Sequence, residues 1–253
     1  MHVLLLAAAL SLTGQWRLQL DRTDAGMPKQ WTQTINLPGT LPEQGIGDDV
    51  TVDTKWTGGI VDKSFFTAPE FEKYRQPGNV KVPFWLQPDK YYAGVAWYQR
   101  DIEVPADWQG KRVVLSLERP HWETRVWVDD KPFGANNRLA TPHDYDLGLL
   151  PPGRHTLTIR VDNRMVIDIG ENSHSVSDHT QGNWNGIVGN IELRATPPVW
   201  IDDVQVCLDT TNKHLRGNAR IVNSTGKISH GTIKWAVNGR QFEGRTGYQC
   251  GAV

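Results

Sequence analysis

Apolar and polar side chains alternate with a period of two along most of this chain, whereas the apolar spacing of an amphipathic helix is almost absent. Strict alternation sends successive side chains to opposite faces of a strand, so that one face packs on a core. The alternating segments recur at intervals of about 8–12 residues and are separated by Pro and Gly clusters, a spacing typical of a β-sandwich or jelly roll. The sequence therefore predicts an all-β protein with strands at 15–20, 96–104, 112–117, 124–128, 145–147, 155–161 and 190–193.

The length of 253 residues suits two domains, because one domain usually takes about 100–200 residues. The segment Thr196–Pro198 is typical of a linker, and we expect residues 14–196 to form the jelly-roll domain. The remaining residues, 197–253, are fewer than the roughly 100 of an immunoglobulin-like sandwich, so we expect a partial, truncated second domain. Its predicted strands lie at 200–206, 217–222 and 232–237.

Gly, Pro and other turn formers are frequent between Gly26 and Gln87. This composition predicts long loops rather than a packed layer. Long loops on a sandwich usually carry binding function or cover an edge of a sheet.

The stretch from Val3 to Leu12 is apolar and has about the length of the hydrophobic region of a signal peptide. It is too short to cross a bilayer as a helix, which takes roughly 20 residues. We predict a signal peptide within residues 1–13 and a secreted or periplasmic protein; a buried first strand is the alternative. Cys207 and Cys250 lie in the last fifth of the chain and could pair after export or stay as thiols.

Net charge and aromatic content indicate which classes of partner the chain could bind. The formal net charge is −1, and Lys and Arg are mixed with Asp and Glu, without the basic stripe that a phosphate backbone attracts. We therefore expect no nucleic-acid partner, and we expect no membrane partner. The chain has eleven Trp residues, whose flat rings suit the C–H faces of sugars, although Trp also anchors cores and interfaces.

Motifs for catalysis are weak. The adjacent acid pairs at 48–49, 129–130 and 202–203 stand in turn or strand-start positions, and neighbours on a strand point to opposite faces, so we predict structural roles for them. No Gly-x-Ser-x-Gly motif marks a serine nucleophile, and no glycine-rich phosphate loop opens a helix. His174, Asp178 and His179 could ligate a metal, but hydrogen bonding within the loop is the favoured interpretation. We predict no metal and no cofactor.

The densest group of polar side chains lies between two predicted strands, within residues 162–186. Its members are amides, imidazoles and carboxylates with one indole among them, grouped as Asp162–Arg164, Glu171–His174, Asp178–Gln181 and Asn183–Gly186. Sugar recognition uses this mixture, since polar groups bind hydroxyls and an aromatic ring supports the apolar face. The alternative is a loop whose side chains bond to its own backbone.

Four motifs in order give the chain a resemblance to a known family: Ala96–Pro105, Val126–Lys131, Leu157–Arg164 and Asn183–Leu193. Together they resemble the N-terminal sugar-binding domain of glycoside hydrolase family 2, which includes β-galactosidases, β-glucuronidases and β-mannosidases. The resemblance covers roughly residues 14–196. The residues after 197 resemble the start of the immunoglobulin-like domain that follows in this family.

The resemblance implies a galactose-binding-like jelly roll, then a sandwich, then a TIM barrel whose two glutamates act as acid/base and nucleophile of a retaining mechanism. No barrel is present in these residues, so we expect no catalytic residue here and no activity from this chain alone. It also implies that a loop of the first domain reaches the terminal sugar. Carried onto this sequence, the substrate-binding candidates are Asp162, Asn163, His174, Asp178, His179, Trp184, Asn185, His121 and Trp122.

Alternatives remain open at this stage. Trp184 could instead anchor the returning strand to the core, and His121 and Trp122 could pack a hairpin. The chain as a whole could be a free-standing carbohydrate-binding protein or a sandwich without a ligand. Because the long loops and the His174–His179 segment depart from the well-known galactosidases, the sequence does not fix the sugar.

Overall fold

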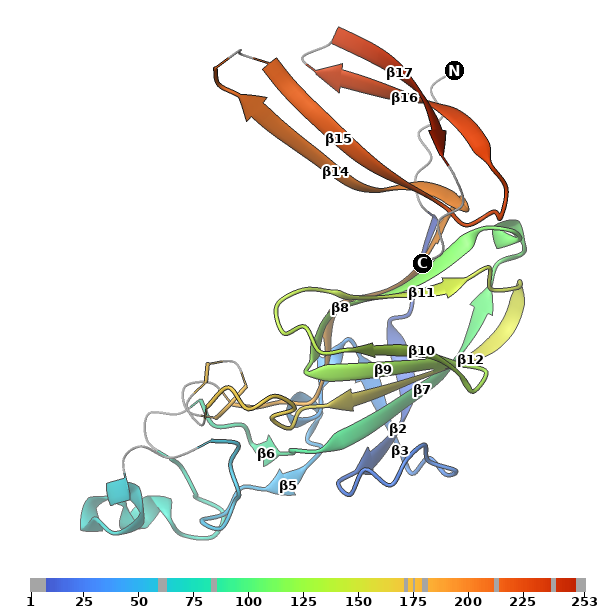
Figure 1. The fold of residues 1–253 in the computed structure, drawn as a ribbon. Helices are drawn as coiled ribbons and strands as arrows, with labels where there is room; N and C mark the ends of the chain where they lie inside the picture. Colours follow the sequence, from blue (N-terminus) through green and yellow to red (C-terminus); the bar gives the residue numbers. More distant parts are fainter. Residues whose placement is uncertain are drawn as a thin grey trace.

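The computed structural model describes residues 8–58, 63–82, 86–170, 173–174, 176–178, 182–211, 214–237 and 240–248. Within them, two antiparallel sheets form a sandwich at the centre of the molecule (Figure 1). The first sheet has the order β1 (Ala8–Ser11), β13 (Gly186–Thr196), β8 (Arg112–His121) and β11 (His143–Gly148), and β4 (Gly39–Thr40) also pairs with β13. The second has the order β10 (Lys131–Asn136), β9 (Glu123–Val128), β12 (Gly153–Asp162), β7 (Val95–Val104), β2 (Gly14–Asp21) and β3 (Gln33–Leu37).

The apolar positions of these strands meet between the sheets in one core. Leu18 and Tyr98 from the second sheet and Leu115 and Ile191 from the first are among its buried members. The pairing of β12 with both β7 and β9 keeps Leu157 and Ile159 on the same inner face. The prediction of an all-β sandwich is confirmed, and the predicted strands from 15–20 to 190–193 all fall within observed ones.

The expectation of loops throughout residues 26–87 is wrong for the stretch that contains β3 and β4. Ile35 and Leu37 alternate on β3 and are buried in the core, because β3 completes one edge of the second sheet against β2. The Gly and Pro content around β3 masked a short strand.

The N-terminal stretch adds a strand from Ala8 to Ser11, β1, which pairs antiparallel with β13. Leu12, which follows it, is 2% exposed and belongs to the core. Residues 8–12 therefore take the form of the alternative interpretation, a first strand. Cleavage of residues 1–13 as a signal peptide stays a prediction, and residues 1–7 lie outside the described part.

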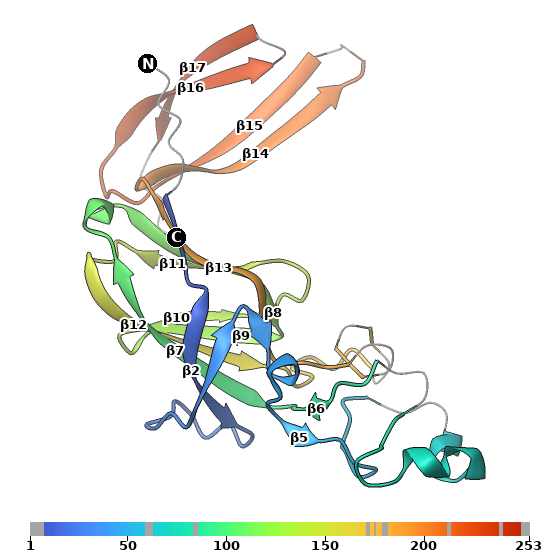
Figure 2. The same ribbon diagram turned by 180° about the vertical axis from the view of Figure 1, so that it is seen from behind.

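A segment between β4 and β6 (Lys90–Tyr91) projects from one end of the sandwich (Figures 1 and 2). It contains β5 (Asp48–Asp49) and the 3-10 helices η1 (Pro42–Gln44), η2 (Lys63–Phe66) and η3 (Pro69–Tyr74). Phe65 and Val82 form a small satellite core there, and Arg75 ties it by donating to the carbonyls of Phe65 and Ala68 at 2.7 and 2.9 Å. This segment supplies one wall of the groove described below.

At the other end of the sandwich, two hairpins follow: β14 (Val199–Asp209) with β15 (His214–Asn223), and β16 (Ser229–Val237) with β17 (Arg240–Tyr248). Gly217 lies under the ring of Trp235, so closely that a Cβ there would be 2.8 Å from it, so the two hairpins face each other. Ile201, Val206 and Leu208 remain more than half exposed. Cys207 is an exposed thiol, and Cys250 lies outside the described residues.

Candidate functional site

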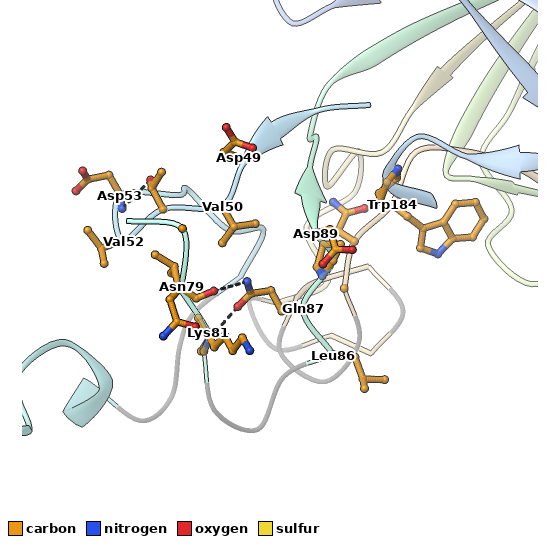
Figure 3. Close-up of a pocket in the computed structure, with 18 of the residues that line it drawn as sticks. Asp49, Val50, Val52, Asp53, Asn79, Lys81, Leu86, Gln87, Asp89 and Trp184 are labelled. Carbon is orange, nitrogen blue, oxygen red and sulfur yellow. Dashed lines mark hydrogen bonds between the residues drawn. The ribbon is translucent and has the colours of Figure 1, made fainter. Parts of the chain in front are cut away.

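A groove of about 1520 Å³ separates the projecting segment from the strand that returns into β13. The projecting segment provides most of its lining, and Gly182, Asn183, Trp184 and Val188 line the other side. The lining residues of the projecting segment include 49–53, 75, 77–82 and 86–89. Figure 3 shows Trp184 at the opposite end of the groove from Asn79 and Lys81. Leu86 is 73% exposed at its rim. Gln87 holds the wall on the projecting segment together by donating to the Val80 carbonyl at 2.7 Å and accepting from the Val82 N–H at 2.9 Å.

Asp162, at the end of β12, is buried and held by arginines. Arg164 binds both of its carboxylate oxygens, at 2.9 and 2.6 Å, and Arg160 donates to the second at 2.9 Å. Burial disfavours the charged carboxylate, but the hydrogen bonds and charge of Arg164, with the charge of Arg160, lower the pKa of Asp162 overall. Both arginines also bind Asp24. Asp162 therefore fixes the point at which the chain leaves the sheet.

Three buried asparagines join the loop to the second sheet. The Asn163 side chain donates to the Tyr92 carbonyl at 2.7 Å and to Asn183 Oδ1 at 3.1 Å. The side-chain amide of Asn183 in turn donates a hydrogen bond to the Asn163 backbone carbonyl at 2.9 Å. Asn185 donates to the carbonyls of Gly94 and Val161 at 3.0 and 3.1 Å. A side-chain amide offers two donors and an acceptor, so these residues satisfy backbone groups where the β ladder ends.

Gly186, the next residue, sits where no side chain fits. Its φ of +151° is unfavourable for other residues, and a Cβ there would be 2.4 Å from the Gly39 carbonyl oxygen. The close approach of β4 to the start of β13 therefore depends on this glycine.

Asp178 lies inside the loop, 1% exposed. Its Oδ2 accepts from the Thr57 N–H and from the Tyr91 hydroxyl, both at 2.8 Å, and its Oδ1 accepts from the Asn183 N–H. Its own N–H donates to the Thr57 carbonyl at 2.6 Å. Burial raises the pKa of the Asp178 carboxyl, and the bonds from Asn183, Tyr91 and Thr57 oppose this rise. Asp178 thus ties the loop to the projecting segment, and a direct contact between its carboxylate and a sugar stays a prediction.

His121 and Trp184 stack on each other at the start of β13, with ring centroids 4.8 Å apart and an interplanar angle of 27°. His121 is 4% exposed. Burial lowers the pKa of its imidazole to about 4, and an interaction with Asn183 opposes this shift. Trp122 is buried, and its indole N–H donates to the Asn137 carbonyl at 2.6 Å. A contact between Trp122 and a sugar stays a prediction.

His174 is exposed, whereas His179 lies outside the described residues. Ser173 donates its hydroxyl to the carbonyls of Ile169 and Gly170, at 2.5 and 2.8 Å. In the part of the chain that the structure describes, no group of three or more His, Cys, Asp or Glu side chains could hold a metal ion. Within the same residues, no helix is both long and apolar enough to pass through a membrane.

Comparison with known proteins decides the family. The model of the glycosyl hydrolases family 2, sugar binding domain, matches residues 9–197. The chain belongs to this family. The match spans the whole sandwich and both walls of the groove.

Curated relatives of this family 2 domain are longer proteins. A β-galactosidase of Arthrobacter sp. (strain B7) is 28% identical over 213 residues, which cover 80% of this chain and 20% of that protein. A β-galactosidase of Thermoanaerobacter pseudethanolicus (strain ATCC 33223 / 39E) is 25% identical over 173 residues, which cover 66% of this chain and 23% of that protein. The chain therefore spans about a fifth of the length of these relatives.

Solved structures of enzymes share the fold. A calcium binding mutant of Bacteroides uniformis β-glucuronidase 2 superposes with a TM-score of 0.62 at 16% identity, over 98% of this chain and 27% of that one. A structure described as a β-galactosidase from Bacteroides fragilis gives a TM-score of 0.62 at 16% identity, over 96% of this chain and 33% of that one. At this identity the likeness establishes the fold alone.

Sequence reasoning missed two residues that organise the site of this family 2 domain, Thr57 and Tyr91. Burial raises the pKa of the Tyr91 hydroxyl, which helps it remain a proton donor to Asp178. Thr57 precedes Tyr91 by 34 residues and Asp178 by 121, so no local pattern connects them. The Gly and Pro content around Thr57 indicated only a loop.

Proposed function

We propose that this chain is the sugar-binding front part of a family 2 glycoside hydrolase and that its groove faces the sugar that the whole enzyme hydrolyses. The observation that carries the proposal is the groove itself, because it lies in the matched domain and is walled by the polar loop before β13. Small-molecule sites usually enclose about 300–1,000 Å³, so a groove of about 1520 Å³ has room for a sugar and its aglycone.

The side chains around the groove support a division of roles. Trp184 lines it and offers an indole suited to the apolar face of a pyranose ring, and His174 is exposed on the same loop. Asp162, Asn163, Asp178 and Asn185 have their hydrogen bonds taken up by the protein and hold that loop in place. In this proposal the buried polar residues act as positioning residues for the exposed ones.

The hydrolytic carboxylates belong, in this proposal, to a TIM barrel in another part of the same polypeptide. The adjacent acids of this chain are engaged in local pairs: Asp48 binds Arg22 at 2.7 Å, Asp49 binds Lys90, and Asp202 binds Arg220. Paired acids of this kind are poor candidates for the two carboxyl groups about 5–10 Å apart that flank a glycosidic bond. We also propose export to the periplasm or the cell exterior, with the apolar N-terminal stretch as its signal.

Titration of the chain with methyl β-D-galactopyranoside and methyl β-D-glucuronide, followed by NMR chemical shifts, tests sugar binding. We expect a dissociation constant on the order of 1 mM, equivalent to about −4 kcal/mol, because the groove is open on one side. Trp184→Ala should abolish the shifts. Trp200→Ala is the matched control, since Trp200 packs against Arg112 at the opposite end of the sandwich and should bind as the parent does. Absence of binding to either glycoside and to their oligomers would refute the proposal.

Reading the gene past the codon for Val253 tests the second part of the proposal, that a TIM barrel belongs to the same polypeptide. An open frame with barrel periodicity and suitably placed glutamates would supply the catalytic part. A stop codon together with measurable sugar affinity would favour a free-standing carbohydrate-binding protein instead.

A further inference from the structure

Aliphatic side chains form much of the lining of the groove. They are Val50, Val52, Val80, Val82, Leu86 and Val188. Val52 is 39% exposed and Leu86 is 73% exposed, so both keep apolar surface in water at the groove. Exposed apolar surface that gathers in a concave site is typical of a place where an apolar group of a ligand binds.

The amide side chains among these residues are bonded to the protein itself. Gln87 uses its oxygen for the Val82 N–H and its nitrogen for the Val80 carbonyl. Asn79 donates its amide to a backbone carbonyl of the same segment at 2.6 Å. Across the groove, the amide of Asn183 donates two hydrogen bonds within the protein, at 3.0 and 2.9 Å. A sugar ring needs polar groups that are free to bind its hydroxyls, so this part of the groove suits an apolar ligand better.

The charged side chains of the lining leave this apolar surface accessible. Asp49, Asp53, Lys81 and Asp89 are all exposed, so their charges stay hydrated. Arg75 is half-buried and donates to backbone carbonyls of the projecting segment. Among these residues the acids are not outnumbered by the bases, so the groove has no excess of positive charge to attract an anion. Its chemistry therefore favours an uncharged apolar group.

A sugar alone would fill only part of the groove. Its volume of about 1520 Å³ exceeds the roughly 300–1,000 Å³ of a usual small-molecule site. Figure 3 shows Val50 and Val52 on the side of the groove opposite Trp184. A glycoside whose sugar packs on Trp184 can therefore extend its aglycone over the aliphatic side chains.

We propose that the groove selects glycosides with an uncharged, apolar aglycone, and that Val50, Val52 and Leu86 form the aglycone subsite. The inference rests on the proposed function and deepens it, because it names the class of substrate and the side chains that select it. Removal of apolar surface from water drives this binding, and each methylene that is fully buried raises the affinity by up to about fourfold.

The test compares methyl and hexyl β-D-galactopyranoside in the NMR titration of the full chain. The hexyl glycoside has five more methylenes, and because the open groove buries only part of them, we expect it to bind about ten- to fiftyfold more tightly. Val52→Ser and Leu86→Ser should each lower this ratio of affinities by about three- to fivefold. Both side chains are exposed, so the variants should fold, and their melting temperatures check this.

Ile201→Ser is the matched control. Ile201 is 57% exposed on β14, at the other end of the sandwich, so this variant should keep the full ratio of the parent chain.

Three results would overturn the inference. Equal affinity of the parent chain for the two glycosides would refute the aglycone subsite and leave the proposed function intact. An unchanged ratio in both Val52→Ser and Leu86→Ser would show that the hexyl group binds away from these side chains. Failure of the parent chain to bind either glycoside would remove the proposed function, and this inference with it.

Discussion

The hydroxyl of Tyr91 donates a hydrogen bond of 2.8 Å to Oδ2 of Asp178, and the two residues are 87 positions apart in the chain. Thr57 adds its N–H to the same oxygen at 2.8 Å and to the Tyr91 hydroxyl at 2.9 Å. The loop before β13 is therefore fastened to the projecting segment by one buried carboxylate. The width of the groove between them depends on this junction.

Asp178→Asn should destabilise the protein by about 1–3 kcal/mol, the usual cost of leaving a buried donor unpaired. Every partner of the carboxylate is a donor, so the NH₂ group of Asn must face at least one of them. The midpoint of urea unfolding measures the loss. Asp168→Asn is the matched control, because Asp168 is exposed on the same loop and, among the residues that the structure describes, accepts only the Gly170 N–H. Equal midpoints for the two variants would contradict this account of Asp178.

Asn185→Leu should cost about 3 kcal/mol, since it removes the acceptor of the Tyr98 hydroxyl and the amide bonds to the carbonyls of Gly94 and Val161. The Gly94 carbonyl keeps only a long bond of 3.4 Å from the Asn163 N–H. Leu has a similar volume, so packing changes little and the loss reports the hydrogen bonds. Asn190→Leu provides the comparison, because Asn190 is exposed on β13, the strand that follows Asn185. We expect the urea midpoint to fall for the first variant only, at unchanged slope.

The sequence predicted the sandwich well because alternation is a local property. The strands from β7 to β13 each carry their own period-two pattern, and the Asp129–Asp130 turn between β9 and β10 could be recognised from its residues. Residues 8–11 could not be assigned in this way. A short apolar run is typical of both an edge strand and a signal peptide, and its pairing with β13 is a long-range contact that no local pattern predicts.

The sequence located the polar loop of the candidate site. It did not separate the residues that hold this loop in place from those that line the groove. Asp178 and Trp184 both stood out as polar-loop residues, yet the carboxylate is buried and the indole lines the groove. The difference depends on Thr57 and Tyr91, which are distant in sequence and lie in a segment without periodicity. Burial of a side chain is a property of the whole fold, so residue type alone could not separate positioning residues from contact residues.

The hairpin turn at Asp129 should make stability depend on pH. His155 donates towards Asp129 Oδ2 at 2.6 Å and the Pro151 carbonyl at 2.8 Å. Burial opposes the charged ring, but the bonds to Asp129 and Pro151 outweigh it and raise the pKa of His155. A raised folded-state pKa stabilises the protein fully below the unfolded value of about 6.5, and this stabilisation is lost as pH rises through the folded value.

Asp129→Asn isolates this pair, because Asn tolerates the φ of +49° and keeps an oxygen for the Thr156 N–H. The variant should melt below the parent at pH 5.5, and the gap should narrow towards pH 9. Asp130→Asn, in the same turn at a φ of +64°, should show a constant difference across that range. If the difference in melting temperature between the parent and Asp129→Asn widened as pH rises, the pairing of His155 with Asp129 would be refuted.

Removal of residues 1–13 should destabilise the sandwich. Leu12 buries its side chain in the core, its N–H donates to the Ile191 carbonyl at 2.8 Å, and its carbonyl accepts from Trp16 Nε1 at 3.1 Å and Arg100 Nη1 at 2.6 Å. Loss of a buried Leu costs about 1.5–3 kcal/mol, and the unpaired groups of Trp16 and Ile191 add to it. A chain that begins at Gly14 should therefore melt well below one that begins at Ala8, which keeps β1. Equal melting temperatures would contradict this contribution of residues 8–13 to the folded domain.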